Sequence, residues 1–341
     1  MRTALRYFLN GAVIALFLLQ SGCGAIELWS HGPNTDKEDW SDWQPCPDMP
    51  LSAKEKIHPV YCLEKHPNSK DVNAKPPLLL LHELNGLTPQ TFRYAMELSR
   101  YFTVYVPKLF GKKGEESVLT GLLVYRFGQE WGVPSDGSAP IVRWLRDVVS
   151  DIEQKHKSLP IRIIGNCMTG ALPLALLSKA DGTVNANINA VVVAQPALPM
   201  RLWWWHTGED YKSLDLSNKD LDRAKLSKTK ILALRFETDQ VSPRVKLDTL
   251  RNDKDFMSRL VDFEICVRGY KSEGNEVKAH STLIGEYDAV DKDGKPSKVG
   301  VLSRNAREIV RNFLLDPTKT AVGNSSCSLK VNSGDTLDSV N

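Results

Sequence analysis

Short aliphatic runs alternate with helix-like segments between Leu78 and Leu315, and this alternation leaves few folds open to the chain. The runs are almost continuously apolar, which is typical of strands that are buried on both faces of a sheet. They predict strands at 78–82, 102–107, 161–165, 188–194, 231–236 and 261–267. Strands that alternate with helices along a chain indicate a mostly parallel sheet with helices on both faces.

Between these runs, apolar residues recur at spacings of three and four, which predicts amphipathic helices. Thr88 followed by Pro89 marks the start of a helix that ends near Arg100, because Thr is a favoured N-cap and Pro fits the first helical position. Further helices are expected at 141–155, 171–177, 245–260 and 302–315. We therefore predict one α/β domain over residues 51–316.

Composition and charge exclude several classes of protein. Hydrophobic residues make up 42% of the chain and charged residues 25%, which is ordinary for a globular protein. Lys and Arg number 44 against 41 Asp and Glu, so the formal net charge is +3. The chain lacks the basic excess of a dedicated nucleic-acid binder, and we expect no nucleic-acid partner.

The first residues have the pattern of an export signal. Arg2 and Arg6 precede an apolar run at 11–19, and small residues follow at 21–24. This run is too short for an ordinary membrane-spanning helix. We predict a signal over residues 1–24 and a location in the periplasm or cell envelope.

Gly22 before Cys23 is also similar to a lipoprotein signal. Lipid on Cys23 would anchor the chain to a membrane, whereas conventional cleavage at 24–25 is the alternative.

Two polar stretches flank the predicted domain. Residues 25–50 are expected to form an irregular lead-in, and residues 317–341 a flexible tail that is rich in Ser, Asn and Thr.

The chain has six cysteines, and an exported chain meets an oxidising compartment in which disulfides persist. Cys23 and Cys167 have other predicted roles, so four cysteines remain. We favour the pairs Cys46–Cys62 and Cys266–Cys327, although four cysteines allow three connectivities.

The sequence predicts neither a metal site nor an organic cofactor. No CxxC motif is present, and no Cys/His pair has the spacing of a zinc site. His82 and Glu83 are followed by Leu84, Asn85 and Gly86, which does not complete the HExxH pattern of zinc proteases.

Cys167 occupies the position of a nucleophile elbow. It follows the predicted strand 161–165 in the sequence Gly-Asn-Cys-Met-Thr-Gly and precedes a predicted helix. A strand, a tight turn at the nucleophile and a helix are what such an elbow requires. Thr169 stands where a second glycine is usual, and Gly170 follows it. A buried structural thiol is the alternative.

Two later loops carry the partners that a nucleophilic thiol needs. Asp239 follows the strand 231–236, and His280 follows the strand 261–267. In α/β-hydrolases the acid and then the base follow the nucleophile in chain order. His280 is the only one of the seven histidines that comes after Asp239. A turn-forming Asp and a solvated loop His are the alternatives.

With these residues, the chain resembles the dienelactone hydrolase family of α/β-hydrolases over 78–315. The Cys167 elbow and the segment Leu81-His82-Glu83-Leu84-Asn85-Gly86 carry the resemblance. It implies an α/β-hydrolase fold and a Cys167–His280–Asp239 triad. It also implies that Glu83 contacts the thiol and helps to control its ionisation. The backbone N–H groups of Leu84 and Met168 would form the oxyanion hole.

The resemblance implies a hydrolase that cleaves an ester, lactone or thioester of small size through a thioacyl-enzyme. An insertion at 198–226 contains Trp203, Trp204 and Trp205. These three side chains are expected to line a lid or pocket, with packing and membrane-surface anchoring as the alternatives.

The same sequence features allow two alternative functions. A non-catalytic envelope protein could use the same scaffold for binding, since fold alone does not establish activity. Cys167 could instead be a redox thiol, although no CxxC partner lies near it.

Overall fold

The computed structural model describes residues 43–46, 58–63, 75–134, 137–157, 159–199, 213–267, 271–272, 275–276, 279–289, 295 and 297–319. Several predicted features lie outside these ranges: the signal with Cys23, most of the lead-in, the Trp203–Trp205 segment, Cys327 and most of the tail. Within the described ranges, no helix combines the length and apolar character that a membrane crossing requires.

The core of the protein is an eight-stranded sheet in the order β1-β2-β4-β3-β5-β6-β7-β8. The strands are β1 (Gln44–Pro45), β2 (Val60–Leu63), β3 (Pro77–Leu80), β4 (Thr103–Pro107), β5 (Ile161–Asn166), β6 (Ile188–Ala194), β7 (Lys230–Phe236) and β8 (Leu260–Ile265). Neighbouring strands from β4 to β8 run parallel, while β2 is antiparallel to β4 and β1 to β2. The sheet is therefore mostly parallel, as predicted, and its antiparallel part is the edge formed by β1 and β2.

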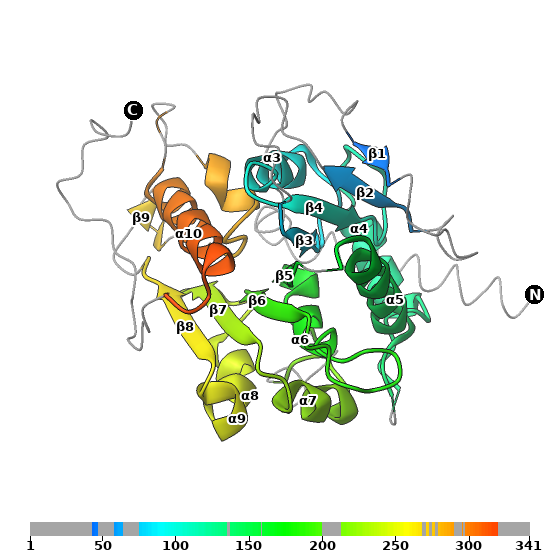
Figure 1. The fold of residues 1–341 in the computed structure, drawn as a ribbon. Helices are drawn as coiled ribbons and strands as arrows, with labels where there is room; N and C mark the ends of the chain where they lie inside the picture. The colour runs from blue at the N-terminus through cyan, green and yellow to red at the C-terminus, as the bar shows by residue number, and fades with distance from the viewer. Residues whose placement is uncertain are drawn as a thin grey trace, which may run out of the picture.

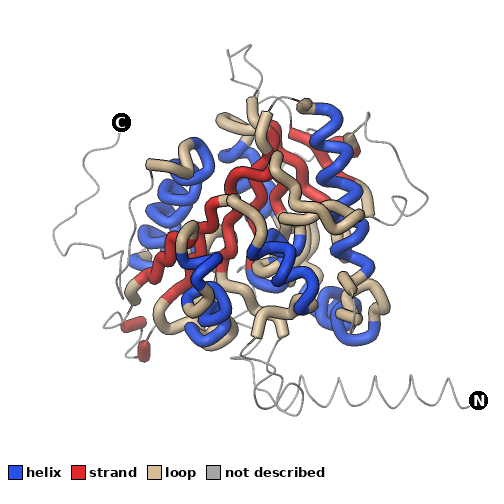
Figure 2. Tube along the Cα trace, turned by 60° about the horizontal axis from the view of Figure 1, so that its bottom comes forward, coloured by secondary structure: helices blue, strands red, loops and turns tan. Residues whose placement is uncertain are grey.

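Helices cover both faces of this sheet (Figures 1 and 2). They are α3 (Pro89–Leu98), α4 (Val118–Phe127), α5 (Pro140–Lys155), α6 (Leu172–Ala175), α7 (Asn218–Lys225), α8 (Asp248–Arg251), α9 (Lys254–Met257) and α10 (Lys298–Leu315). Alternate residues of β6 enter different cores. Val191 and Val193 pack with α5 and α6, whereas Val192 and Ala194 pack with α3 and α10. This period of two follows from the strand geometry and explains the continuously apolar strands.

Most predicted elements are present, and the helix that follows Thr88 has the expected cap, since the Thr88 side chain accepts a hydrogen bond from Thr91 N–H. The single helix predicted at 245–260 is wrong. The chain instead forms a 3₁₀ turn, α8 and α9, because the Asp253 side chain accepts the Asp255 N–H and starts a new helix. The helix predicted at 171–177 is also shorter, and Leu177 N–H bonds to Leu174 O in a tighter turn.

Helix α7, which belongs to the insertion at 198–226, is fastened to the body of the domain by a buried ion pair. Arg146 of α5 contacts Asp220 of α7 at 2.7 Å, and both side chains are almost fully buried. Ser138 and Ser217 donate further hydrogen bonds to the Asp220 carboxylate. The last part of the insertion is therefore a fixed wall of the domain.

A disulfide joins Cys46 and Cys62 and ties β1 to β2 at the sheet edge, with 5.2 Å between the two Cα atoms. The structure thus contains the predicted pair Cys46–Cys62. Cys266, just after β8, is also disulfide-bonded, and its predicted partner Cys327 lies outside the described residues. Cys167 is a free, buried thiol.

Replacing both Cys46 and Cys62 with alanine is expected to lower the free energy of unfolding by about 3 kcal/mol, because the loop that they close spans 16 residues. Denaturant titration of the variant beside the wild-type chain measures this change. An unchanged midpoint and slope would show that the edge strands are held by packing alone.

Candidate active site

The predicted site residues come together at the carboxyl ends of adjacent strands. Glu83 follows β3, Cys167 follows β5, Asp239 follows β7 and His280 comes after β8. In the sheet, β3 is next to β5 and β7 is next to β8, with β6 between β5 and β7. Ligands of open α/β sheets bind at this edge, so the sheet topology itself assembles the side chains.

The backbone at Cys167 has the left-handed conformation, with φ of 50°. This conformation costs a residue with a side chain energy, and such strain gathers at functional sites. Gly165 and Gly170 make the sharp turn feasible. A Cβ on Gly165 would lie 2.4 Å from Thr169 O, and one on Gly170 would lie 2.6 Å from Pro196 Cα. The second glycine of the elbow is therefore needed at 170 rather than at 169.

Thr169 has a bonding role that a glycine could not fill. Its hydroxyl oxygen accepts the Asn166 N–H at 3.0 Å and lies 3.2 Å from His82 O. Asn166 Nδ2 also donates to Leu81 O. These contacts hold the elbow against the loop that follows β3.

Asp239 and His280 form a hydrogen-bonded pair, with 2.8 Å between Asp239 Oδ2 and His280 Nδ1. The other carboxylate oxygen of Asp239 accepts the N–H groups of Val241 and Ser242, each at 2.9 Å. Asp239 is 3% exposed and His280 4% exposed. The carboxylate therefore fixes the imidazole in one orientation.

The second ring nitrogen of His280 faces Cys167. Nε2 is buried and has no hydrogen-bond partner of standard geometry within the described ranges, yet Cys167 is close enough to act on the ring electrostatically. Burial lowers the pKa of His280, but the negative charges of Asp239 and Cys167 outweigh it, and the pKa is raised well above its usual value. The arrangement favours the protonated form of the His280 ring.

Helix α10 supports the loop that carries His280. Ser303 Oγ donates to Thr282 O at 2.6 Å, and Arg307 Nε donates to Leu283 O at 2.7 Å. Both α10 side chains are buried. The loop is thus held by two bonds from a regular element.

Arg235 is a supporting residue that the sequence analysis did not single out. It lies on β7 with 2% of its surface exposed, and its guanidinium donates to the carbonyls of Glu237, Asp239 and Ser242. It also pairs with Glu264 of β8. A charged residue inside an otherwise apolar strand was the signal that could have revealed it.

Glu83 is 1% exposed and belongs to a buried polar network. Its carboxylate accepts hydrogen bonds from Gln195 Nε2 at 2.9 Å and from Ser281 Oγ at 2.7 Å. Gln195 has φ of 33°, a second strained residue at this edge. Ser281 adjoins His280 in the chain, so Glu83 is linked to the histidine loop.

Two backbone donors belong to the segments around Cys167: Met168 directly follows it, and Leu84 lies in the loop after β3 that the elbow contacts. The N–H groups of Leu84 and Met168 make no hydrogen bond with any part of the chain that the structure describes, although both residues are buried. Buried N–H groups are normally paired. Their segments are held together by the Asn166 and Thr169 bonds described above.

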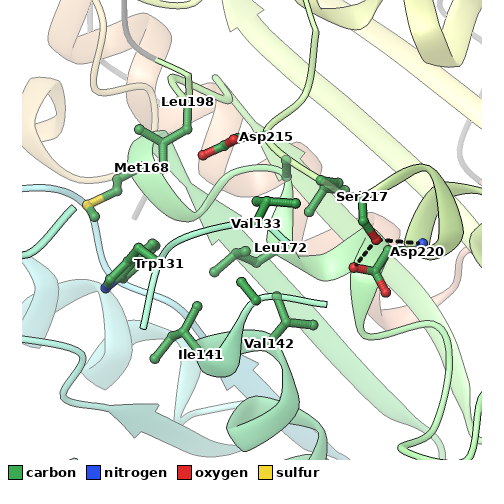
Figure 3. Close-up of a pocket in the computed structure, with 13 residues that line it drawn as sticks. Trp131, Val133, Ile141, Val142, Met168, Leu172, Leu198, Asp215, Ser217 and Asp220 are labelled. Atoms are coloured by element: carbon green, nitrogen blue, oxygen red, sulfur yellow. Dashed lines mark hydrogen bonds between the residues drawn. The ribbon is translucent and has the colours of Figure 1, made fainter. Parts of the chain in front are cut away.

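A largely apolar cavity lies directly beside the elbow (Figure 3). Its walls are Trp131, Val133, Ala139, Ile141, Val142, Met168, Ala171, Leu172, Leu198, Asp215, Leu216, Ser217 and Asp220. The described ends of the insertion supply Leu198 and the residues from Asp215 onward. Asp215 accepts a hydrogen bond from Tyr125 at 3.1 Å. Trp203, Trp204 and Trp205 lie outside the described residues.

Lys246 is a buried cation close to this site. Its ammonium group donates to Pro199 O at 2.8 Å, and the side chain is 1% exposed. Burial lowers the pKa of Lys246 to about 7, although the negative charges of Asp215 and Asp239 raise it. Among the described residues, no group of three His, Cys, Asp or Glu side chains is placed to hold a metal ion.

The strand order, the antiparallel edge and the strained elbow after β5 decide the fold. The fold is that of the α/β-hydrolases. This confirms the predicted fold class. No family profile matches the chain, and no curated protein matches it.

Solved structures of dienelactone hydrolase-like and other α/β-hydrolase proteins are similar to the chain. A provisionally assigned dienelactone hydrolase from Klebsiella pneumoniae subsp. pneumoniae is 14% identical, with a TM-score of 0.45 over 73% of this chain and 90% of that one. A dienelactone hydrolase-like promiscuous phosphotriesterase from metagenomic libraries is 12% identical, with a TM-score of 0.43 over 75% and 92%. An esterase from Pyrobaculum calidifontis is 11% identical, with a TM-score of 0.41 over 74% and 80%.

Proposed function

We propose that the protein is a carboxylic ester hydrolase that uses a Cys167–His280–Asp239 triad and forms a thioacyl-enzyme. The observation that carries the proposal is the buried Asp239–His280 pair next to a strained, free Cys167. A nucleophile, a base and a carboxylate that orients the base are the parts that covalent acyl transfer requires.

In this mechanism, the Cys167 thiolate attacks the carbonyl carbon and forms a C–S bond. The carbonyl oxygen becomes an oxyanion that accepts the N–H groups of Leu84 and Met168. His280 then donates its proton to the leaving alcohol as the C–O bond breaks. A water molecule, deprotonated by His280, attacks the thioester and releases the acid and the thiolate.

The cavity beside Met168 supports an ester, lactone or thioester with an apolar acyl group as the substrate. Trp131, Ile141 and Leu172 offer apolar surface there. Asp215 supplies a carboxylate to the same walls, and this disfavours a substrate that carries its own carboxylate. The Trp203–Trp205 segment belongs to the proposed lid. The role proposed for Glu83 is to tune the charge near the thiol from its network with Gln195 and Ser281.

We further propose that the chain works outside the cytoplasm, in the periplasm or cell envelope. The Cys46–Cys62 disulfide and the disulfide at Cys266 support this location, because disulfides persist in oxidising compartments. Lipid on Cys23 would tether the domain to a membrane, and conventional cleavage would release it.

Turnover of p-nitrophenyl esters with acyl chains of two to eight carbons tests the proposal. We expect release of nitrophenol above background, with a preference among uncharged acyl chains. A series with a terminal carboxylate on the acyl chain is the matched control and should react more slowly. Lack of turnover and of any acyl adduct across the panel would favour the binding scaffold. A reversible sulfenic acid on Cys167 would favour the redox thiol.

A further inference from the structure

His82 is a fully buried histidine at the start of the loop that carries Glu83 and Leu84. Its Nδ1 lies 2.8 Å from the carbonyl oxygen of Glu83. Its Nε2 accepts the backbone N–H of Leu109 at 3.0 Å. Phe110 packs edge-on against the ring, with 4.8 Å between the centroids. Both ring nitrogens are therefore engaged, and neither faces the cavity.

These contacts fix the tautomer of the ring. A backbone N–H can only donate, so Nε2 must carry a lone pair, and the proton of a neutral ring is then on Nδ1. The pKa of His82 is consistent with a neutral ring, because burial lowers it to about 4. His82 thus donates from Nδ1 to Glu83 O and accepts at Nε2.

The acceptor of that bond belongs to the peptide group that contains the Leu84 N–H. In a trans peptide, the C=O and the N–H of one planar group point in opposite directions. Gly86 N–H also donates to Glu83 O, at 3.0 Å. The oxygen of this peptide group is held on one side, so the Leu84 N–H points to the opposite side. The Leu84 N–H has no partner within the described chain.

We infer that His82 is a positioning residue, which directs the Leu84 N–H into the oxyanion hole by holding the carbonyl of Glu83 through Nδ1–H. The inference rests on the proposed function, because it assigns His82 a role in that same reaction. His82 does not touch the reacting atoms. Its contribution is to fix the peptide plane before the oxyanion develops.

The two bonds of His82 can be separated with two variants. In His82→Asn the amide nitrogen replaces Nδ1 and can still donate to Glu83 O. In His82→Gln the amide oxygen replaces Nε2 and can still accept the Leu109 N–H. We expect His82→Gln to lose about 10- to 100-fold in kcat, part of what the loss of an oxyanion donor costs. KM should be unchanged, and His82→Asn should recover most of the turnover.

Two further readouts separate positioning from a general structural effect. A trifluoromethyl ketone analogue of the best ester forms a C–S bond with Cys167, and its oxygen becomes an oxyanion. The Ki of this analogue should rise in parallel with the loss of kcat. Alkylation of Cys167 by iodoacetamide needs no oxyanion hole, so its rate should be unaltered in both variants.

Equal losses in the two variants, or a larger loss in His82→Asn, would overturn the inference, as would a loss confined to KM. If either variant fails to fold, ¹⁵N NMR of histidine in the wild-type chain decides. A proton on Nε2 of His82 would contradict the assignment, and a proton on Nδ1 would support it. Absence of any turnover that depends on Cys167 in the wild-type chain would instead refute the proposed function.

Discussion

Replacement of Cys167 with alanine is expected to reduce kcat for the best ester by about 10⁴-fold or more, because the variant has no atom that can form the acyl-enzyme. The thiol is 5% exposed and follows β5 directly. Alanine removes only the sulfur atom, so we expect the loss to come without a matching loss of thermal stability. Steady-state kinetics of the variant beside the wild-type chain measures the effect.

Cys167→Ser is the matched control for this substitution. It keeps the size and polarity of the side chain but replaces the thiolate with a hydroxyl that is a much weaker nucleophile. Both variants should therefore be far slower than the wild type. Wild-type turnover in Cys167→Ala would contradict the proposed mechanism and leave the buried thiol as a structural residue.

Replacement of Asp239 with asparagine is expected to reduce kcat by about 10⁴-fold, as it does in other triads. The asparagine oxygen can still accept the N–H groups of Val241 and Ser242, so the loop should keep its shape. The amide nitrogen then faces Nδ1 of His280, which forces the tautomer that places the proton on Nε2. His280 can no longer act as a base toward Cys167.

The same substitution is also expected to change the pH at which His280 loses its proton. Burial lowers the pKa of His280, and the charge of Asp239 is the largest of the effects that raise it. Without that charge the imidazolium should lose its proton at a lower pH than in the wild type. NMR titration of the His280 ring measures the midpoint, with His280→Ala to assign the signal. An equal or higher midpoint in Asp239→Asn would show that the pair is not electrostatically coupled.

The sheet could be predicted from sequence because its strands are buried on both faces, so each one is a continuous apolar run that few other environments produce. The prediction fails in regions where local features of the sequence mask or interrupt the helical pattern. The segment at 245–260 has helical spacing, but Asp253 caps its own short helix and breaks the segment. Helix α4 was not predicted because Leu119, Leu123 and Phe127 are exposed on it, which obscures the apolar stripe.

The positions of Asp239 and His280 followed from chain order, since a fixed strand order puts the ends of successive strands at one edge. The contacts that support these residues could not be predicted from chain order. Glu83 and Ser281 are 198 residues apart in the chain, and Glu83 and Gln195 are 112 apart. Only the folded sheet brings such distant residues together, and their residue types are common on protein surfaces.

Intact-protein mass spectrometry during turnover of a slowly hydrolysed p-nitrophenyl ester would detect a thioacyl-enzyme. We expect the wild-type chain to gain the mass of one acyl group, peptide mapping to place it on Cys167, and the adduct to decay at the rate of turnover. Asp239→Asn should accumulate the adduct more slowly, and Cys167→Ala should show none. Turnover with no acyl adduct, or with an adduct on another residue, would contradict a thioacyl-enzyme on Cys167.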